Sequence, residues 1–198
     1  MNKRLLTILL IIIVTFTSCS GGDGGVLIPV EKDGIKKVKT GNDDTAAEFE
    51  SNGLLFQVAG SWKEIERQTL NIIIENKSDS AKNVDFKMLK LVNKLNESLN
   101  VDTIAEVSNV NNANIESSSV ELYKAGSESS KKSGVIGIEP KQRRFLYIRF
   151  RGYTLEETVP DVGQQIKIEM PTGESTSKEI WFNCEYGSIF DYVTRFFW

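Results

Sequence analysis

The sequence predicts an all-β domain, built as an antiparallel sandwich of two sheets with about seven or eight strands. Three observations lead to this fold class. Short segments carry apolar residues at every second position, turn-forming residues separate these segments, and few stretches show the 3.6-residue period of a helix. Alternation at every second position is typical of strands that bury one face and expose the other.

The first 18 residues form a leader with the order of an export signal peptide. Two basic residues, Lys3 and Arg4, precede an apolar stretch at residues 5–14 and a mostly small, hydroxylated stretch at 15–18. The apolar stretch is shorter than the roughly 20 residues of a membrane-spanning helix. We therefore expect residues 1–18 to be removed as a signal peptide, and an uncleaved membrane anchor is the alternative.

Cys19 follows this leader directly. The run Phe16, Thr17, Ser18, Cys19 resembles the lipobox of bacterial lipoproteins. This resemblance implies cleavage before Cys19, a diacylglyceryl thioether on its sulfur and acylation of the new N-terminus, with fatty acids such as palmitate. It also implies the outer membrane in a cell with two membranes, because Ser20 replaces the Asp that signals inner-membrane retention. Three acyl chains exceed the two signals that stable anchoring needs.

Residues 19–51 are predicted to be the lipidated N-terminus and a flexible tether. Residues 20–25 read SGGDGG, which is a linker composition, and residues 32–51 are polar and charged. Between them lies a short apolar island, residues 26–30, which is a candidate edge strand because Pro29 cannot donate to a central ladder.

Residues 52–186 are predicted to be the β-sandwich domain. A phase slip at Leu89 and Leu91 indicates a bulge. Residues 93–119 and 124–134 are polar and are predicted to be long loops, the first with a short strand or helix. The expected strands contain the following alternating segments: 54–58, 70–74, 84–88, 120–122, 136–138, 146–150, 166–170 and 180–184.

The runs TLNIIIENKSDSAKNVDFKML and GIEPKQRRFLYIRF within this domain resemble, in general pattern, immunoglobulin-like domains of cell envelopes. The resemblance implies an immunoglobulin-like sandwich. The Cys-Trp-Cys core of true immunoglobulins is missing, so no specific family follows.

Composition limits the chemistry. The chain has no histidine, which excludes Ser-His-Asp and Cys-His catalysis and most zinc sites. Without the leader the formal net charge changes from −3 to −5, since the leader holds two basic and no acidic residues. An acidic chain lacks the basic footprint of a nucleic-acid-binding protein, so we expect no nucleic acid. No motif in the sequence predicts a cofactor or a metal, so none is expected, and carboxylate-only, Lys-based or Ca²⁺-dependent chemistry stays open.

The strongest charge cluster is the segment KQRRFLYIRFR at residues 141–151. In a strand its basic and aromatic residues share one face: Arg143, Phe145, Tyr147, Arg149 and Arg151. Such a face suits an anionic glycan, a phospholipid headgroup or an acidic protein partner. The alternative is a solvated face whose charges pair with carboxylates on neighbouring strands, such as Glu169.

Two further groups have a functional and a structural interpretation. Glu156, Glu157 and Asp161 could act as acid and base on a sugar bond or ligate Ca²⁺, or they form a solvated acidic turn. Cys184 alternates with Ile180 and Phe182 and is predicted to face the core, with an intermolecular disulfide as the alternative.

Residues 187–198 form an aromatic C-terminal tail that ends in IFDYVTRFFW. Its pattern fits a helix or a strand. The tail either docks on its own domain or inserts into a partner's groove or the membrane interface. Tyr192, Phe196 and Trp198 are its candidate contact residues.

The expected function is therefore a non-catalytic binding or assembly role at the bacterial cell envelope, with membrane attachment through Cys19 and an envelope protein or anionic glycan as the partner. One alternative is a carboxylate-dependent enzyme that acts on envelope polysaccharide. The other is a protective, exclusion or inhibitor lipoprotein.

Overall fold

A computed structural model describes residues 25–40, 45–64, 67–92, 96–107, 119–126, 134–150, 165–173 and 175–186. Several predictions lie outside the described residues. They concern the leader 1–18, Cys19, the last arginine of the basic face, the acidic group and the aromatic tail: Arg151, Glu156, Glu157, Asp161, Tyr192, Phe196 and Trp198.

The described residues form thirteen strands and one short 3-10 turn, η1. In chain order these elements are β1 (Gly25–Pro29), β2 (Lys36–Lys39), β3 (Thr45–Ser51), β4 (Leu54–Glu64), β5 (Arg67–Asn76), β6 (Lys82–Asp85), η1 (Phe86–Met88), β7 (Lys90–Val92), β8 (Ser98–Val107), β9 (Ser119–Lys124), β10 (Val135–Ile138), β11 (Arg143–Phe150), β12 (Gln165–Pro171) and β13 (Ser177–Tyr186).

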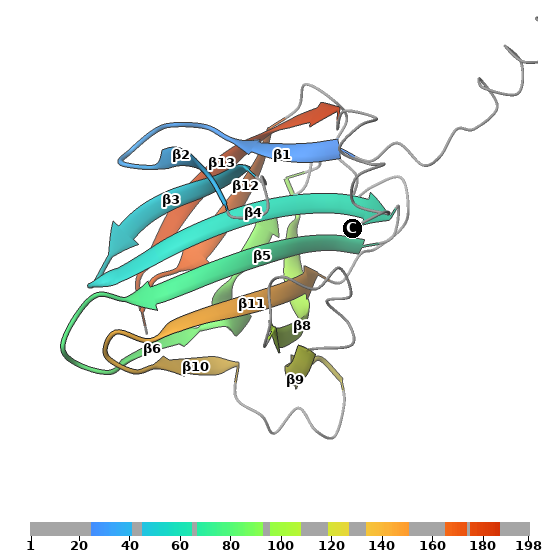
Figure 1. The fold of residues 1–198 in the computed structure, drawn as a ribbon. Coiled ribbons are helices and arrows are strands. Elements are labelled where there is room, and N and C mark those ends of the chain that lie inside the picture. Colours follow the sequence, from blue (N-terminus) through green and yellow to red (C-terminus); the bar gives the residue numbers. More distant parts are fainter. Residues whose placement is uncertain are drawn as a thin grey trace, which may run out of the picture.

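Eight of these strands form one closed antiparallel sheet, in the order β1-β13-β12-β7-β8-β11-β5-β4 (Figure 1). The ring closes at β1, which pairs with β13 along its whole length and with β4 through Gly25–Leu27. The prediction of an all-β antiparallel fold is confirmed. The sheet is closed, whereas the expected immunoglobulin-like sandwich has two separate sheets. Alternation could not predict this difference, because it shows that one face of a strand is buried and not whether the edges of the sheet meet.

Three further strands extend the closed sheet. β2 and β3 continue from β4, so that β3 pairs with the first half of β4 and β1 pairs with the second half on the same edge. β9 pairs with the second half of β8 in the same way, while β7 pairs with its first half. Residues 25–51, which were expected to belong largely to a tether, therefore supply β1, β2 and β3 to the fold.

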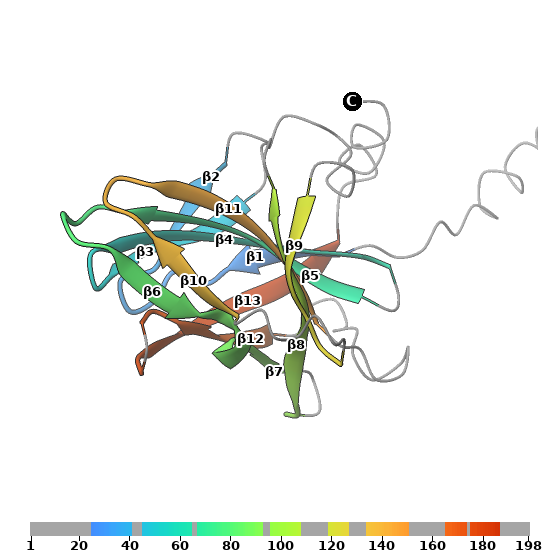
Figure 2. The ribbon, with the colours of Figure 1, turned by 90° about the horizontal axis from the view of Figure 1, so that it is seen from below.

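A two-stranded ribbon of β6 and β10 lies across the closed sheet, next to β11 (Figures 1 and 2). It buries Val84, Ile136 and Ile138 in the main core. The phase slip after β6 is the turn η1 rather than a bulge, and the Asp85 side chain caps it by accepting a hydrogen bond from the Lys87 N–H at 3.1 Å.

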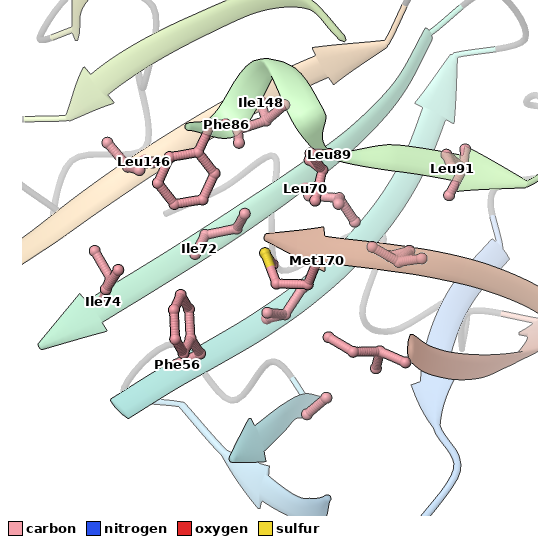
Figure 3. Packing of buried hydrophobic residues seen from close by; sticks show 14 of the residues in the cluster. Phe56, Leu70, Ile72, Ile74, Phe86, Leu89, Leu91, Leu146, Ile148 and Met170 are labelled. Carbon is pink, nitrogen blue, oxygen red and sulfur yellow. The ribbon is translucent and has the colours of Figure 1, made fainter. Parts of the chain in front are cut away.

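Apolar side chains fill the interior of the closed sheet. Figure 3 shows Phe56, Ile72 and Leu146 from β4, β5 and β11 facing Met170 from β12 and Phe86 from η1. Leu70, Ile74, Leu89, Leu91 and Ile148 are buried in the same cluster. Cys184 is also buried there, as its alternation predicts. The interior is thus a packed core of apolar side chains, and the charged side chains of the strands lie mainly on the outward faces.

Candidate functional site

The predicted basic face lies on the outside of β11. Alternation along this strand is confirmed, since Leu146, Ile148 and Phe150 are buried in the core. On the other face Arg143 is exposed, and Phe145, Tyr147 and Arg149 are half-buried. The face continues onto β5 on one side of β11 and onto β8 on the other.

Arg149 is held by β8. Its Nε and Nη2 donate to Oδ2 of Asp102 at 3.0 and 2.7 Å, and its Nη2 also donates to Oγ1 of Thr103 at 2.9 Å. The carboxylate that pairs with this arginine is therefore Asp102 rather than Glu169, because β8 neighbours β11 and β12 does not. Since its charge is compensated within the sheet, Arg149 contributes less than expected to attraction of an anionic ligand.

Arg143 differs from Arg149 in its surroundings. Its guanidinium lies over the ring of Phe145, with the Cζ atom 5.2 Å from the ring centroid, which is within the range of a cation–π contact. Glu75 stands opposite Arg143 on β5 and accepts a hydrogen bond from Lys77 at 2.6 Å. Among the described arginines of the predicted face, Arg143 is thus the exposed one, and its guanidinium lies on an aromatic ring.

Apolar side chains continue this surface onto the neighbouring strands. Ile73 of β5 lies directly opposite Phe145, and Leu55 of β4 is the diagonal neighbour of Ile73. Both are half-buried on the outward face. We use the name β11 face for the group of Leu55, Ile73, Arg143, Phe145 and Tyr147. It combines apolar contact area with one exposed cation, which is the composition of a protein-binding patch.

The sequence interpretation missed Arg144, the neighbour of this face. Its Nε and Nη2 donate to Oε1 and Oε2 of Glu106 at 2.7 and 2.6 Å, and its Nη1 donates to the carbonyl of Gly137 at 2.7 Å. Arg144 has the same phase as Leu146, and a charge in the core phase is a signal for a partly buried pair. Glu106 was not identifiable as the partner, because residues 93–119 were interpreted as a long loop with a short strand or helix whose neighbours in the sheet were not predicted.

A second outward face, on β12 and β13, is polar, and its charged side chains pair with one another. Lys167 lies 2.8 Å from Glu179 and 3.0 Å from Glu169. The hydrogen bond to Glu179, and then the one to Glu169, raises the pKa of Lys167 above its ordinary value. Trp181 is half-buried opposite Lys167, and Gln165 donates to Asn183 at 2.9 Å. Because these groups satisfy one another, this face offers a weaker site for a charged ligand than the β11 face does.

The described part of the chain holds no cluster of three His, Cys, Asp or Glu side chains placed to bind a metal ion. It also holds no helix long and apolar enough to cross a membrane.

Comparison with known proteins found no relative of this chain. No family model matches the chain, and neither a curated protein nor a solved structure matches it at the significance required.

Proposed function

We propose that this protein is a lipid-anchored envelope protein with a non-catalytic binding or assembly role. Support for the anchor comes from the basic, apolar and small-residue zones that precede Cys19. Support for a non-catalytic role comes from the absence of histidine in the sequence and from the packed interior of the closed sheet. In a cell with two membranes the missing Asp after Cys19 favours the outer membrane.

The β11 face is the contact surface of this proposal, and the observation that carries it is the exposed guanidinium of Arg143 on the ring of Phe145. The outer side of a guanidinium that lies on a ring can meet an acidic or aromatic partner group, and Arg and aromatic residues are enriched in binding hot spots. Leu55 and Ile73 extend the apolar area beside the ring.

Two experiments test the two halves of the proposal. For the anchor, cells are labelled with a fatty acid and the protein is compared with Cys19→Ala. Label on the parent and none on the variant supports lipidation, and label on both or on neither contradicts it.

For the contact surface, a cross-linking pulldown from intact envelopes compares the parent with Arg143→Glu. The matched control is Lys36→Glu, which makes the same charge change at an exposed position on β2, four strands away in the sheet. We expect a partner that the parent and Lys36→Glu recover and that Arg143→Glu loses by about tenfold or more. Recovery of the same partners by all three proteins contradicts a role of the β11 face.

A further inference from the structure

The turn between β3 and β4 consists of two residues, Asn52 and Gly53. Ser51 and Leu54 on either side of them are paired with each other. Asn52 and Gly53 both have a positive φ, 53° and 78°. Positive φ at both loop residues is typical of a type I′ turn, which Asn-Gly suits because asparagine tolerates this conformation and glycine has no Cβ. Asn-Gly occurs once in the sequence, at this turn.

The side chain of Asn52 reaches the turn between β12 and β13. Its Nδ2 donates to the carbonyl of Thr172 and to Oγ1 of Thr176, both at 3.0 Å, across 120 and 124 positions of the sequence. Oγ1 of Thr176 also lies 2.9 Å from Oγ1 of Thr172, which is a buried residue. A side-chain amide has two N–H hydrogens, so each hydrogen of Asn52 has an acceptor. The amide group is thus held in place although Asn52 is an exposed residue.

Gly53 fixes the other side of the same turn. Its carbonyl accepts a hydrogen bond from the Lys77 N–H at 2.8 Å. A Cβ at position 53 would lie 3.0 Å from the Cβ of Ser78, and the positive φ alone disfavours any other residue there. The β3–β4 turn therefore touches both the β12–β13 turn and the turn after β5, and the fold requires a glycine after Asn52.

Asn-Gly is also a dipeptide that loses the asparagine amide readily, because glycine has no side chain to hinder the approach of its nitrogen. The backbone nitrogen of Gly53 attacks Cγ of Asn52 and gives its proton to solvent. The new N–Cγ bond closes a five-membered succinimide, while the Cγ–Nδ2 bond breaks and ammonia leaves. Water then adds to one of the two succinimide carbonyls, which yields aspartate or isoaspartate. Water is the only other reactant.

We propose that Asn52 is a site of spontaneous deamidation, and that the two hydrogen bonds from its Nδ2 to the β12–β13 turn slow this reaction in the folded protein. Ring closure turns Cγ of Asn52 toward the Gly53 nitrogen, and this movement breaks both hydrogen bonds. A hydrogen bond of ordinary strength slows the reaction about fivefold, so the two together slow it about 25-fold. The inference goes beyond the proposed function, since it requires neither lipid on Cys19 nor a partner of the β11 face.

Deamidation removes a connection between two turns of the closed sheet. A carboxylate at position 52 has no hydrogen to donate, so it would place an acceptor against the Thr172 carbonyl, which is also an acceptor. The variant Asn52→Asp carries this change, and Asp-Gly suits a type I′ turn as well as Asn-Gly does. We therefore expect Asn52→Asp to unfold at a lower urea concentration than the parent. An unchanged midpoint would contradict a stabilising connection between the turns.

The test follows deamidation in the chain from Cys19 to Trp198 in mildly alkaline buffer, by mass mapping of peptides prepared in acid. The parent is incubated folded and, in parallel, unfolded in urea. In urea we expect Asn52 to react before the other asparagines. In the folded parent we expect its reaction to be about 25-fold slower.

Two substitutions at Thr176 separate the hydroxyl from the rest of the side chain. Thr176→Val keeps the shape of threonine and removes the acceptor Oγ1, whereas Thr176→Ser keeps the hydroxyl. We expect folded Thr176→Val to deamidate about fivefold faster than the folded parent, and Thr176→Ser to react at the parent rate. Gly60→Ala on β4 is the control for stability, because an added Cβ collides with Leu27 and leaves the turn unchanged.

Three results would overturn the inference. The first is an asparagine other than Asn52 that reacts first in urea. The second is equal reaction of Asn52 in the folded and the unfolded parent. The third is a Thr176→Val rate that equals the parent rate or that Gly60→Ala matches, since either would mean that the hydrogen bond to Thr176 does not restrain Asn52. If Thr176→Val does not fold, Thr176→Ala makes the same comparison.

Discussion

At the scale of single residues, Asn76 connects the turns at one end of the closed sheet. It is fully buried at the end of β5. Its Nδ2 donates to the carbonyls of Ser80 and Ile138 at 2.8 and 2.9 Å, and its Oδ1 accepts from the N–H and Oγ of Ser78 at 3.0 and 2.7 Å. One side chain therefore joins the turn after β5 to the end of β10.

Asn76→Ala should lower the free energy of unfolding by about 2–4 kcal/mol, because it removes the partner of the buried Ile138 carbonyl and of the part-buried Ser78 N–H. Ser80→Ala is the matched control in the same turn. It keeps the backbone carbonyl that Asn76 uses and should change stability by less than about 0.5 kcal/mol. Urea denaturation of the two variants measures the difference, and equal midpoints would show that Asn76 does not hold the turns together.

Sequence patterns predicted whether a side chain faces the core or the outside better than they predicted which residue it pairs with. The burial of Ile180, Phe182 and Cys184 and the outward positions of Arg143 and Arg149 follow from the period of two alone. The pairing of Arg149 with Asp102 does not, because a partner depends on which strands are neighbours in the sheet.

At the scale of elements, the strands that were missed, or in the case of β8 left open as a short strand or helix, have weak or short alternation. β3 reads TAAEFES, in which two buried alanines give little hydrophobic contrast. β8 reads SLNVDTIAEV, and its outward Ala105 is buried as well as the inward Ile104, so the period of two is interrupted. β2 reads KKVK, which has one apolar residue and the lysines typical of a protected edge strand. Such segments become strands through pairing with neighbours that carry the stronger pattern.

Contact between β1 and β4 leads to a prediction about Gly60. A Cβ at this position would collide with Cδ1 of Leu27 and would lie 3.1 Å from the Cβ and Cγ of Leu27. Leu27 is buried in the core, so it cannot move without displacing its neighbours. Gly60→Ala should therefore lower stability by about 1–3 kcal/mol.

The matched control for Gly60→Ala is Gly137→Ala in β10, where the nearest atom to an added Cβ is Oδ1 of Asn83 at 3.5 Å. This variant should be as stable as the parent or slightly more so, since alanine reduces the entropy of the unfolded chain. Urea denaturation compares both with the parent. If the two substitutions lower the free energy of unfolding equally, then the close packing of β1 on β4 does not require a glycine at position 60.

At the scale of the whole molecule, closure joins the two ends of the described chain. β1 is the first strand and β13 the last, and their pairing completes a ring in which β1 also contacts β4. No local pattern in the sequence encodes this pairing, because it depends on the twist and number of the strands between them. That is the physical reason why an all-β antiparallel class could be predicted and the closed arrangement could not.

The closed arrangement predicts that β1 is essential to the fold and that the residues before it are not. A chain that begins at Gly25 keeps every strand and should unfold at the same urea concentration as one that begins at Ser20. A chain that begins at Glu31 lacks β1 and leaves one edge of β13 and the second half of one edge of β4 unpaired. It also loses the buried side chain of Leu27. We expect its free energy of unfolding to fall by more than about 3 kcal/mol, from the lost apolar burial and the exposed sheet edges. Equal stability of all three chains would mean that pairing of β1 with β4 and β13 contributes nothing to the stability of the closed sheet.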